Sequence, residues 1–138
     1  MSSFDASSIT QGAAPADAPI VYICVTCRPV GDPDSPLRPG RALAEATARA
    51  AVGTEVQVRP MRCLGNCTRG PSAAVRCNNS WTYVFGGLDV TSADALVEGA
   101  RLLARSADGI LPWRGRPVPL KRGLVARVPP TGFEEIGE

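Results

Sequence analysis

Cysteine is the residue type through which this sequence could do chemistry. Four of the five cysteines form two close pairs, Cys24 with Cys27 and Cys63 with Cys67, while Cys77 stands alone. Thiolates are soft ligands, and four of them suit either a [2Fe–2S] cluster or a tetrahedral zinc ion. We expect the two pairs to meet as two loops at one end of a sheet and to bind one metal centre.

The residues around the two pairs favour a negatively charged centre. Arg28, Arg62 and Arg69 flank the cysteines, and an oxidised [2Fe–2S] cluster with four thiolates carries a net charge of −2. Gly65 and Gly70 would let backbone N–H groups approach the sulfur atoms closely. These features favour iron–sulfur over zinc, but the spacing alone leaves zinc open.

The cysteines also allow two other interpretations. Cys24 and Cys27 could form a thioredoxin-type dithiol, but such a motif takes its low thiol pKa from a helix N-terminus. Here about a dozen residues rich in proline and glycine precede the next predicted helix. Free cysteines are also often small buried hydrophobic residues, which fits Cys77 better than it fits four paired cysteines.

The composition excludes several classes of protein. The 138 residues are enough for one domain, and 44% of them are apolar, which is enough for a globular core. Histidine is absent, which excludes His-based nucleophilic catalysis, His-ligated zinc and His-ligated haem. We therefore expect a binding or carrier protein and not an enzyme.

The first half of the chain predicts a strand, a helix and a second strand. Residues 1–19 are small and polar, and we expect them to be disordered. Residues 20–24 predict a buried strand, and residues 28–40 predict a loop because they contain four prolines. A helix is expected over residues 41–52, ended by Gly53, and a strand over residues 54–59, stopped by Pro60.

The second half predicts a hairpin and a helix. Residues 61–71 read as the cysteine-bearing loop, and residues 72–77 and 81–85 as the two strands of the hairpin. Thr91 or Ser92 is expected to cap a helix with Asp94 in its first turn. The order of elements predicts an α/β protein with a thioredoxin-like mixed sheet flanked by helices. We divide the chain into residues 1–19, a domain over residues 20–107, and an extended C-terminal arm over residues 108–138.

Charge is distributed unevenly along the chain. The net charge of +2 is too small to predict nucleic-acid binding, but residues 101–127 hold seven basic side chains against the single Asp108. This basic strip could steer an acidic protein partner, or it could be an ordinary solvated surface. No stretch is long and apolar enough to span a membrane, and the N-terminus lacks a secretory signal, so we expect a cytoplasmic protein.

The motifs of this chain resemble those of a known family. Residues 63–75, with the pattern C-x₃-C-x₂-G-P before an apolar strand, resemble the second half of thioredoxin-like [2Fe–2S] ferredoxins. More narrowly, the chain resembles the DUF1636 family of predicted metal-binding proteins over about residues 20–130. The shared motifs are C-x-x-C-R at residues 24–28, the cysteine loop, W-x-Y-x-F-G-x-L at residues 81–88 and R-x-P-P at residues 127–130.

This resemblance implies a one-electron carrier with a [2Fe–2S] cluster on Cys24, Cys27, Cys63 and Cys67. It also implies a redox partner, a homodimer and a link to cobalamin metabolism. The alternatives are a zinc-binding or metal-handling module without redox chemistry and, third, a thiol–disulfide oxidoreductase. The chain departs from the wider family in having only two residues between its first two cysteines. Cys77 is the only cysteine left to replace a ligand.

Overall fold

The computed structural model describes residues 18–25, 39–62, 64–65, 71–78 and 80–130. In this part of the chain five strands form one mixed sheet in the order β2-β1-β3-β4-β5, where β3 is Ala73–Arg76, β4 is Thr82–Phe85 and β5 is Leu124–Val128. Strand β1 (Ile20–Cys24) is parallel to β2 (Gln57–Met61), and the remaining neighbours are antiparallel. Helix α2 (Pro39–Ala50) lies in the connection between β1 and β2. Parallel strands need a long crossover connection of this kind, usually with a helix.

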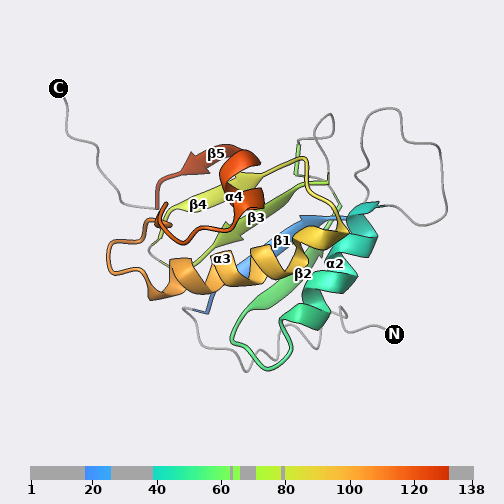
Figure 1. Ribbon diagram of the computed structural model, residues 1–138, viewed down its shortest axis with the longest axis horizontal. Coiled ribbons are helices and arrows are strands. Elements are labelled where there is room, and N and C mark those ends of the chain that lie inside the picture. Colours follow the sequence, from blue (N-terminus) through green and yellow to red (C-terminus); the bar gives the residue numbers. More distant parts are fainter. Residues whose placement is uncertain (1–17, 26–38, 63, 66–70, 79, 131–138) are drawn as a thin grey trace.

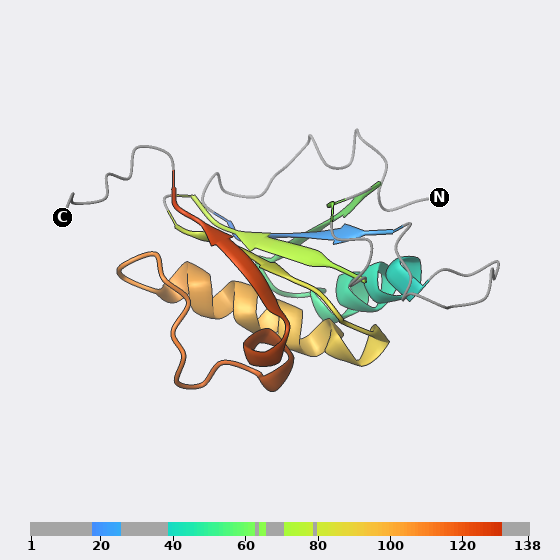
Figure 2. The ribbon, with the colours of Figure 1, turned by 90° about the horizontal axis from the view of Figure 1, so that it is seen from above.

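The helices cover one face of the sheet. Figure 2 shows α2, α3 (Ala93–Arg105) and α4 (Val118–Arg122) on the same side of the five strands. Alternate residues of the central strands point into this layer, including Val21 and Ile23 of β1, which are fully buried. Tyr83 and Phe85 of β4 (Thr82–Phe85) are also buried there, and their rings are stacked with centroids 6.3 Å apart. The mixed sheet and its helices confirm the predicted fold class.

The hairpin is confirmed, because β3 (Ala73–Arg76) pairs with β4 in antiparallel register. The predicted strand over residues 54–59 begins later and continues past Pro60. Thr54 causes the late start: its hydroxyl donates to the Ala51 carbonyl and accepts from the Val56 N–H, which holds a turn. Pro60 is tolerated because β2 is an edge strand, where a missing N–H need not break a ladder.

Both helix starts differ from the prediction. Helix α2 already begins at Pro39, within the segment predicted as a loop, and proline is well suited to a first helical position. At the second helix the cap is Asp89, whose carboxylate accepts from the Thr91 N–H at 2.9 Å and begins a 3-10 turn, η2 (Val90–Ser92). The Ser92 hydroxyl accepts from the Asp89 N–H, so it gives no side-chain cap to α3.

Within the segment predicted as an extended C-terminal arm, residues 108–130 contribute regular structure that the sequence did not predict. Strand β5 (Leu124–Val128) pairs with β4 and becomes the fifth strand of the sheet (Figure 1). Helix α4 buries Leu120 completely in the core. At the other end of the predicted domain, Ala18 and Pro19 are buried, and the Pro19 carbonyl accepts from the Gln57 N–H.

Candidate metal centre

Cys24 ends the central strand β1, with a neighbouring strand on each side. Its N–H donates to the Ser72 carbonyl at 3.0 Å, and the N–H of Val25 donates to the Met61 carbonyl at 2.9 Å. The Cys24 side chain is fully buried. The main chain on both sides therefore fixes where this thiol lies.

The thiol of Cys24 contacts the residue that directly precedes Cys63, the first cysteine of the second pair. Its Sγ donates to the carbonyl oxygen of Arg62 at 3.4 Å, and the next residue after Arg62 is Cys63. Ser72, which binds the Cys24 N–H, follows the same segment at its other end. Cys24 thus lies beside both described ends of the loop that carries Cys63 and Cys67, as the predicted convergence of the two pairs requires.

Three of the four predicted ligands, Cys27, Cys63 and Cys67, lie outside the described residues, as do Arg28, Arg69 and Gly70. Within the described part of the chain, no three Cys, Asp or Glu side chains come together as a metal site. The four-cysteine ligand set therefore stays a prediction. Its donor chemistry fits an iron–sulfur cluster, and it fits zinc as well.

Cys77 lies at the other end of the sheet. It directly follows β3, and the last residue of β3, Arg76, pairs with Ile20 at the start of β1. Cys24 lies at the other end of β1, where its N–H donates to the Ser72 carbonyl. Ser72 and Cys77 are five residues apart along the extended β3 segment, which corresponds to about 16 Å at 3.3 Å per residue. Cys77 is therefore too far from Cys24 to replace one of its co-ligands.

Two features near Cys24 bear on the other expectations. Gly65 has a φ of +80° and open space at its Cβ position, so the backbone conformation requires glycine there. Helix α2 starts at Pro39, and the residues directly after Cys27, where a low-pKa dithiol needs a helix N-terminus, lie outside the described part of the chain.

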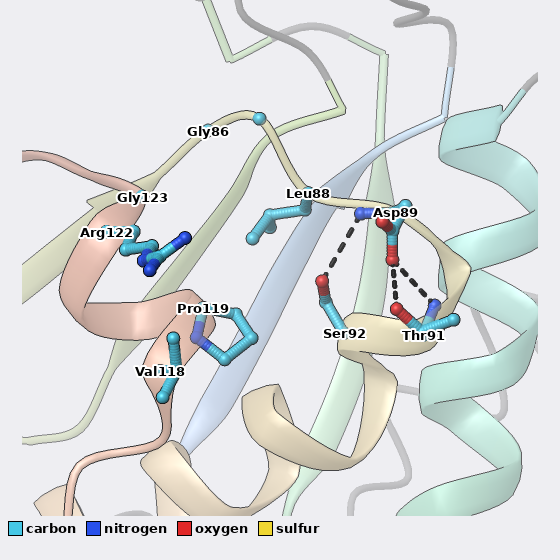
Figure 3. Close-up of a pocket in the computed structure, with 10 residues that line it drawn as sticks. Gly86, Leu88, Asp89, Thr91, Ser92, Val118, Pro119, Arg122 and Gly123 are labelled. Atoms are coloured by element: carbon cyan, nitrogen blue, oxygen red, sulfur yellow. Dashed lines mark hydrogen bonds between the residues drawn. The ribbon is translucent and has the colours of Figure 1, made fainter.

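A cavity of about 350 Å³ opens at the same end of the sheet as Cys24 (Figure 3). Phe85, Ala73 and Ile23 form one row across β4, β3 and β1, so the next positions, Gly86 and Cys24, lie at the same sheet end. Leu88, which lines the cavity, donates its N–H to the Pro71 carbonyl at 3.1 Å. The exit of the cysteine loop is therefore hydrogen-bonded to the cavity wall.

Sequence reasoning missed this cavity because two distant segments, residues 86–92 and 118–123, form it. The sequence signal that could have indicated the cavity is the pair of glycines Gly86 and Gly123. The N–H of Gly86 donates to the Gly123 carbonyl at 2.8 Å, and a Cβ on Gly123 would lie 2.7 Å from the Gly86 oxygen. Only a residue without a side chain permits this approach of α4 to the end of β4.

In the described part of the chain, no helix has the length and apolar character needed to cross a bilayer.

The fold is shared with solved structures of one ferredoxin. The chain is similar to a thioredoxin-like [2Fe–2S] ferredoxin from Aquifex aeolicus, with 21% identity, a TM-score of 0.55, and coverage of 86% of this chain and 100% of that chain. Two cysteine-to-serine variants of the Aquifex aeolicus ferredoxin match with 20% identity and a TM-score of 0.51, each covering 78% of this chain and 98% of its own. At these identities the likeness shows a thioredoxin-like fold.

A search of curated proteins found no match. The family model described as "Protein of unknown function (DUF1636)" matches residues 21–130, which is most of the chain and includes all five cysteines. The chain therefore belongs to the DUF1636 family.

Proposed function

We propose that this protein is a one-electron carrier whose [2Fe–2S] cluster is held by Cys24, Cys27, Cys63 and Cys67. The observation that carries the proposal is the position of Cys24, which is buried beside both described ends of the loop that carries Cys63 and Cys67. The fold shared with a [2Fe–2S] ferredoxin supports it. When bound, such a cluster supplies reversible uptake of one electron.

The residues of the chain would tune this centre. Burial of Cys24 excludes water from one ligand, and the β1 and β3 backbones hold its position. Arg62 is exposed beside Cys24 and contributes a positive charge. Each added electron makes a four-thiolate centre more negative, so a nearby guanidinium favours the reduced state.

We propose a carrier and not an enzyme. A thiol–disulfide oxidoreductase needs an accessible, low-pKa thiol at a helix N-terminus. Cys24 is fully buried at a strand end, and α2 begins twelve residues after Cys27. Four thiolates would hold zinc equally well, so a non-redox zinc module is the second candidate, and metal analysis separates the two.

The partner assignment belongs to the same proposal. We propose an acidic redox partner, because the strip of residues 101–127 has seven basic side chains against one acidic side chain. The homodimer, the cytoplasmic location and the link to cobalamin metabolism stay predictions.

Single cysteine variants test the ligand set. We expect Cys24→Ala, Cys63→Ala and Cys67→Ala each to lose most of the visible absorbance and bound iron, because alanine has no donor atom. Cys77→Ala is the matched control. It removes a buried thiol at the far end of the sheet and is expected to keep the cluster. Full absorbance in the first three variants, or its loss in the control, would contradict the ligand set.

A further inference from the structure

The basic strip contains cations that acidic side chains of the domain do not neutralise. Among the described residues, Arg101 pairs with Glu55 at 3.7 Å and Arg105 with Glu98 at 3.8 Å. Neither Lys121 nor Arg122 of α4 has a carboxylate within ion-pair distance in that part of the chain. Asp108, the single acid of the strip, accepts from the N–H of Ile110 and the hydroxyl of Ser106. Among the described residues, the positive charge of Lys121 and Arg122 is therefore not compensated by an ion pair.

An exposed tryptophan lies among these cations. Trp113 is 61% exposed, although tryptophan is the largest apolar side chain of the domain. The Nζ of Lys121 lies 4.8 Å from its ring centroid, and the guanidinium carbon of Arg116 lies 5.1 Å from it. Exposed aromatic side chains next to arginine and lysine are typical of binding hot spots in protein interfaces.

The loop that carries Trp113 is held in place by the buried side chain of Arg116. Arg116 is buried, and its guanidinium donates to the Leu111 carbonyl at 2.6 Å and to the Pro112 carbonyl at 3.1 Å. The N–H of Arg116 donates to the Trp113 carbonyl at 3.1 Å, and its guanidinium also lies over the Tyr83 ring. Trp113 is thus presented by a fixed backbone, which lowers the entropy lost when a partner binds.

The cavity adjoins α4, the helix that also carries Lys121. Its lining includes Val118, which is 58% exposed, and Arg122, which is the only basic residue among the lining side chains. Figure 3 shows Arg122 on the α4 wall, across the cavity from Asp89. The Asp89 carboxylate accepts from the N–H and the hydroxyl of Thr91. Asp89 and Arg122 form no ion pair in the described part of the chain, so the guanidinium of Arg122 is available to a carboxylate that enters.

We propose that the α4 surface, formed by Trp113, Val118, Lys121 and Arg122, is the docking surface for an acidic redox partner. A partner carboxylate enters the cavity and binds Arg122, while an adjacent partner segment packs over Trp113. The proposal rests on the proposed function in taking the partner to be a redox protein. The site is suited to that role because the cavity wall is hydrogen-bonded to Pro71, at the exit of the cysteine loop.

A dye-labelled peptide of six glutamates tests the surface through fluorescence anisotropy at low salt, with the full-length protein as purified. We expect Arg122→Gln and Trp113→Ala each to raise the Kd by about tenfold, the size of a hot-spot contact. Arg76→Gln is the matched control, because it removes one exposed positive charge at the opposite end of the sheet. We expect this control to change the Kd by less than about twofold.

The outcomes separate this inference from the proposed function. If Arg76→Gln weakens binding as much as Arg122→Gln, or if the peptide does not bind, the docking surface is wrong. Thermal unfolding of each variant shows whether it is folded, and an unfolded Trp113→Ala variant is replaced by Trp113→Gln. The visible absorbance of the same samples reports on the cluster independently. Selective binding by a colourless zinc protein would support the surface and contradict the electron carrier.

Discussion

Tyr83 joins the sheet to the C-terminal segment through one buried hydrogen bond. Its hydroxyl accepts from the N–H of Leu111 at 2.9 Å, and both residues are almost completely buried. A buried donor that loses its partner keeps its desolvation cost without compensation. The position of residues 109–117, and therefore of Trp113, depends in part on this contact.

We predict that Tyr83→Phe lowers the free energy of unfolding by about 1–3 kcal/mol, because it leaves the Leu111 N–H unsatisfied. Urea unfolding followed by circular dichroism measures the change. Tyr22→Phe is the control, since Tyr22 is only partly buried on the face of the sheet that the helices do not cover. We expect a change within about 0.5 kcal/mol for the control. Equal losses in the two variants would contradict the role given to the Tyr83 hydroxyl.

Among the elements, α4 and β5 show most clearly that residues 108–130 are integrated into the domain. Strand β5 extends the sheet beyond β4, and the close approach of Gly123 to Gly86 joins α4 to the end of β4. Leu120 of α4 is fully buried, and a Cβ on Gly99 of α3 would lie 2.3 Å from its Cδ1 atom. The small residue on α3 therefore makes room for α4.

We predict that Leu120→Ala lowers the free energy of unfolding by about 2–5 kcal/mol, because it leaves a cavity in the core. Val118→Ala, in the same helix, is the control and should cost less than about 1 kcal/mol, since Val118 is 58% exposed. Chemical denaturation of both variants provides the comparison. If the Leu120 variant were as stable as the control, α4 would be a peripheral attachment and not part of the core.

The elements also show how far the sequence determines the fold. Apolar runs, helical spacing and turn residues predicted β1, the β3–β4 hairpin and the two long helices, because these patterns are local. The 3-10 turn before α3 was missed because Asp89, two or three residues before the predicted cap at Thr91 or Ser92, takes the first N–H groups. In strand β5 only Leu124 is partly buried, and Val125 to Val128 are all exposed. An edge strand of this kind carries no clear pattern, and only its pairing with β4 reveals it.

At the scale of the whole molecule, the sheet places the two described cysteines, Cys24 and Cys77, at opposite ends. Spacing could pair Cys24 with Cys27 and Cys63 with Cys67, but it could not show where the unpaired cysteine lies. The antiparallel pairing of β1 with β3 places Cys77 at the opposite end from Cys24. The same folding brings α4 and the cavity to the end that carries Cys24, which no local pattern could reveal.

The visible spectrum and metal content of anaerobically purified protein test the central claim most directly. If the protein is a [2Fe–2S] carrier, we expect it to be red-brown, with about two irons per chain and absorption bands between about 320 and 550 nm that dithionite bleaches. These bands arise from thiolate and sulfide bound to iron, so a zinc protein lacks them. A colourless protein with one zinc ion per chain would contradict the electron carrier and favour the zinc module.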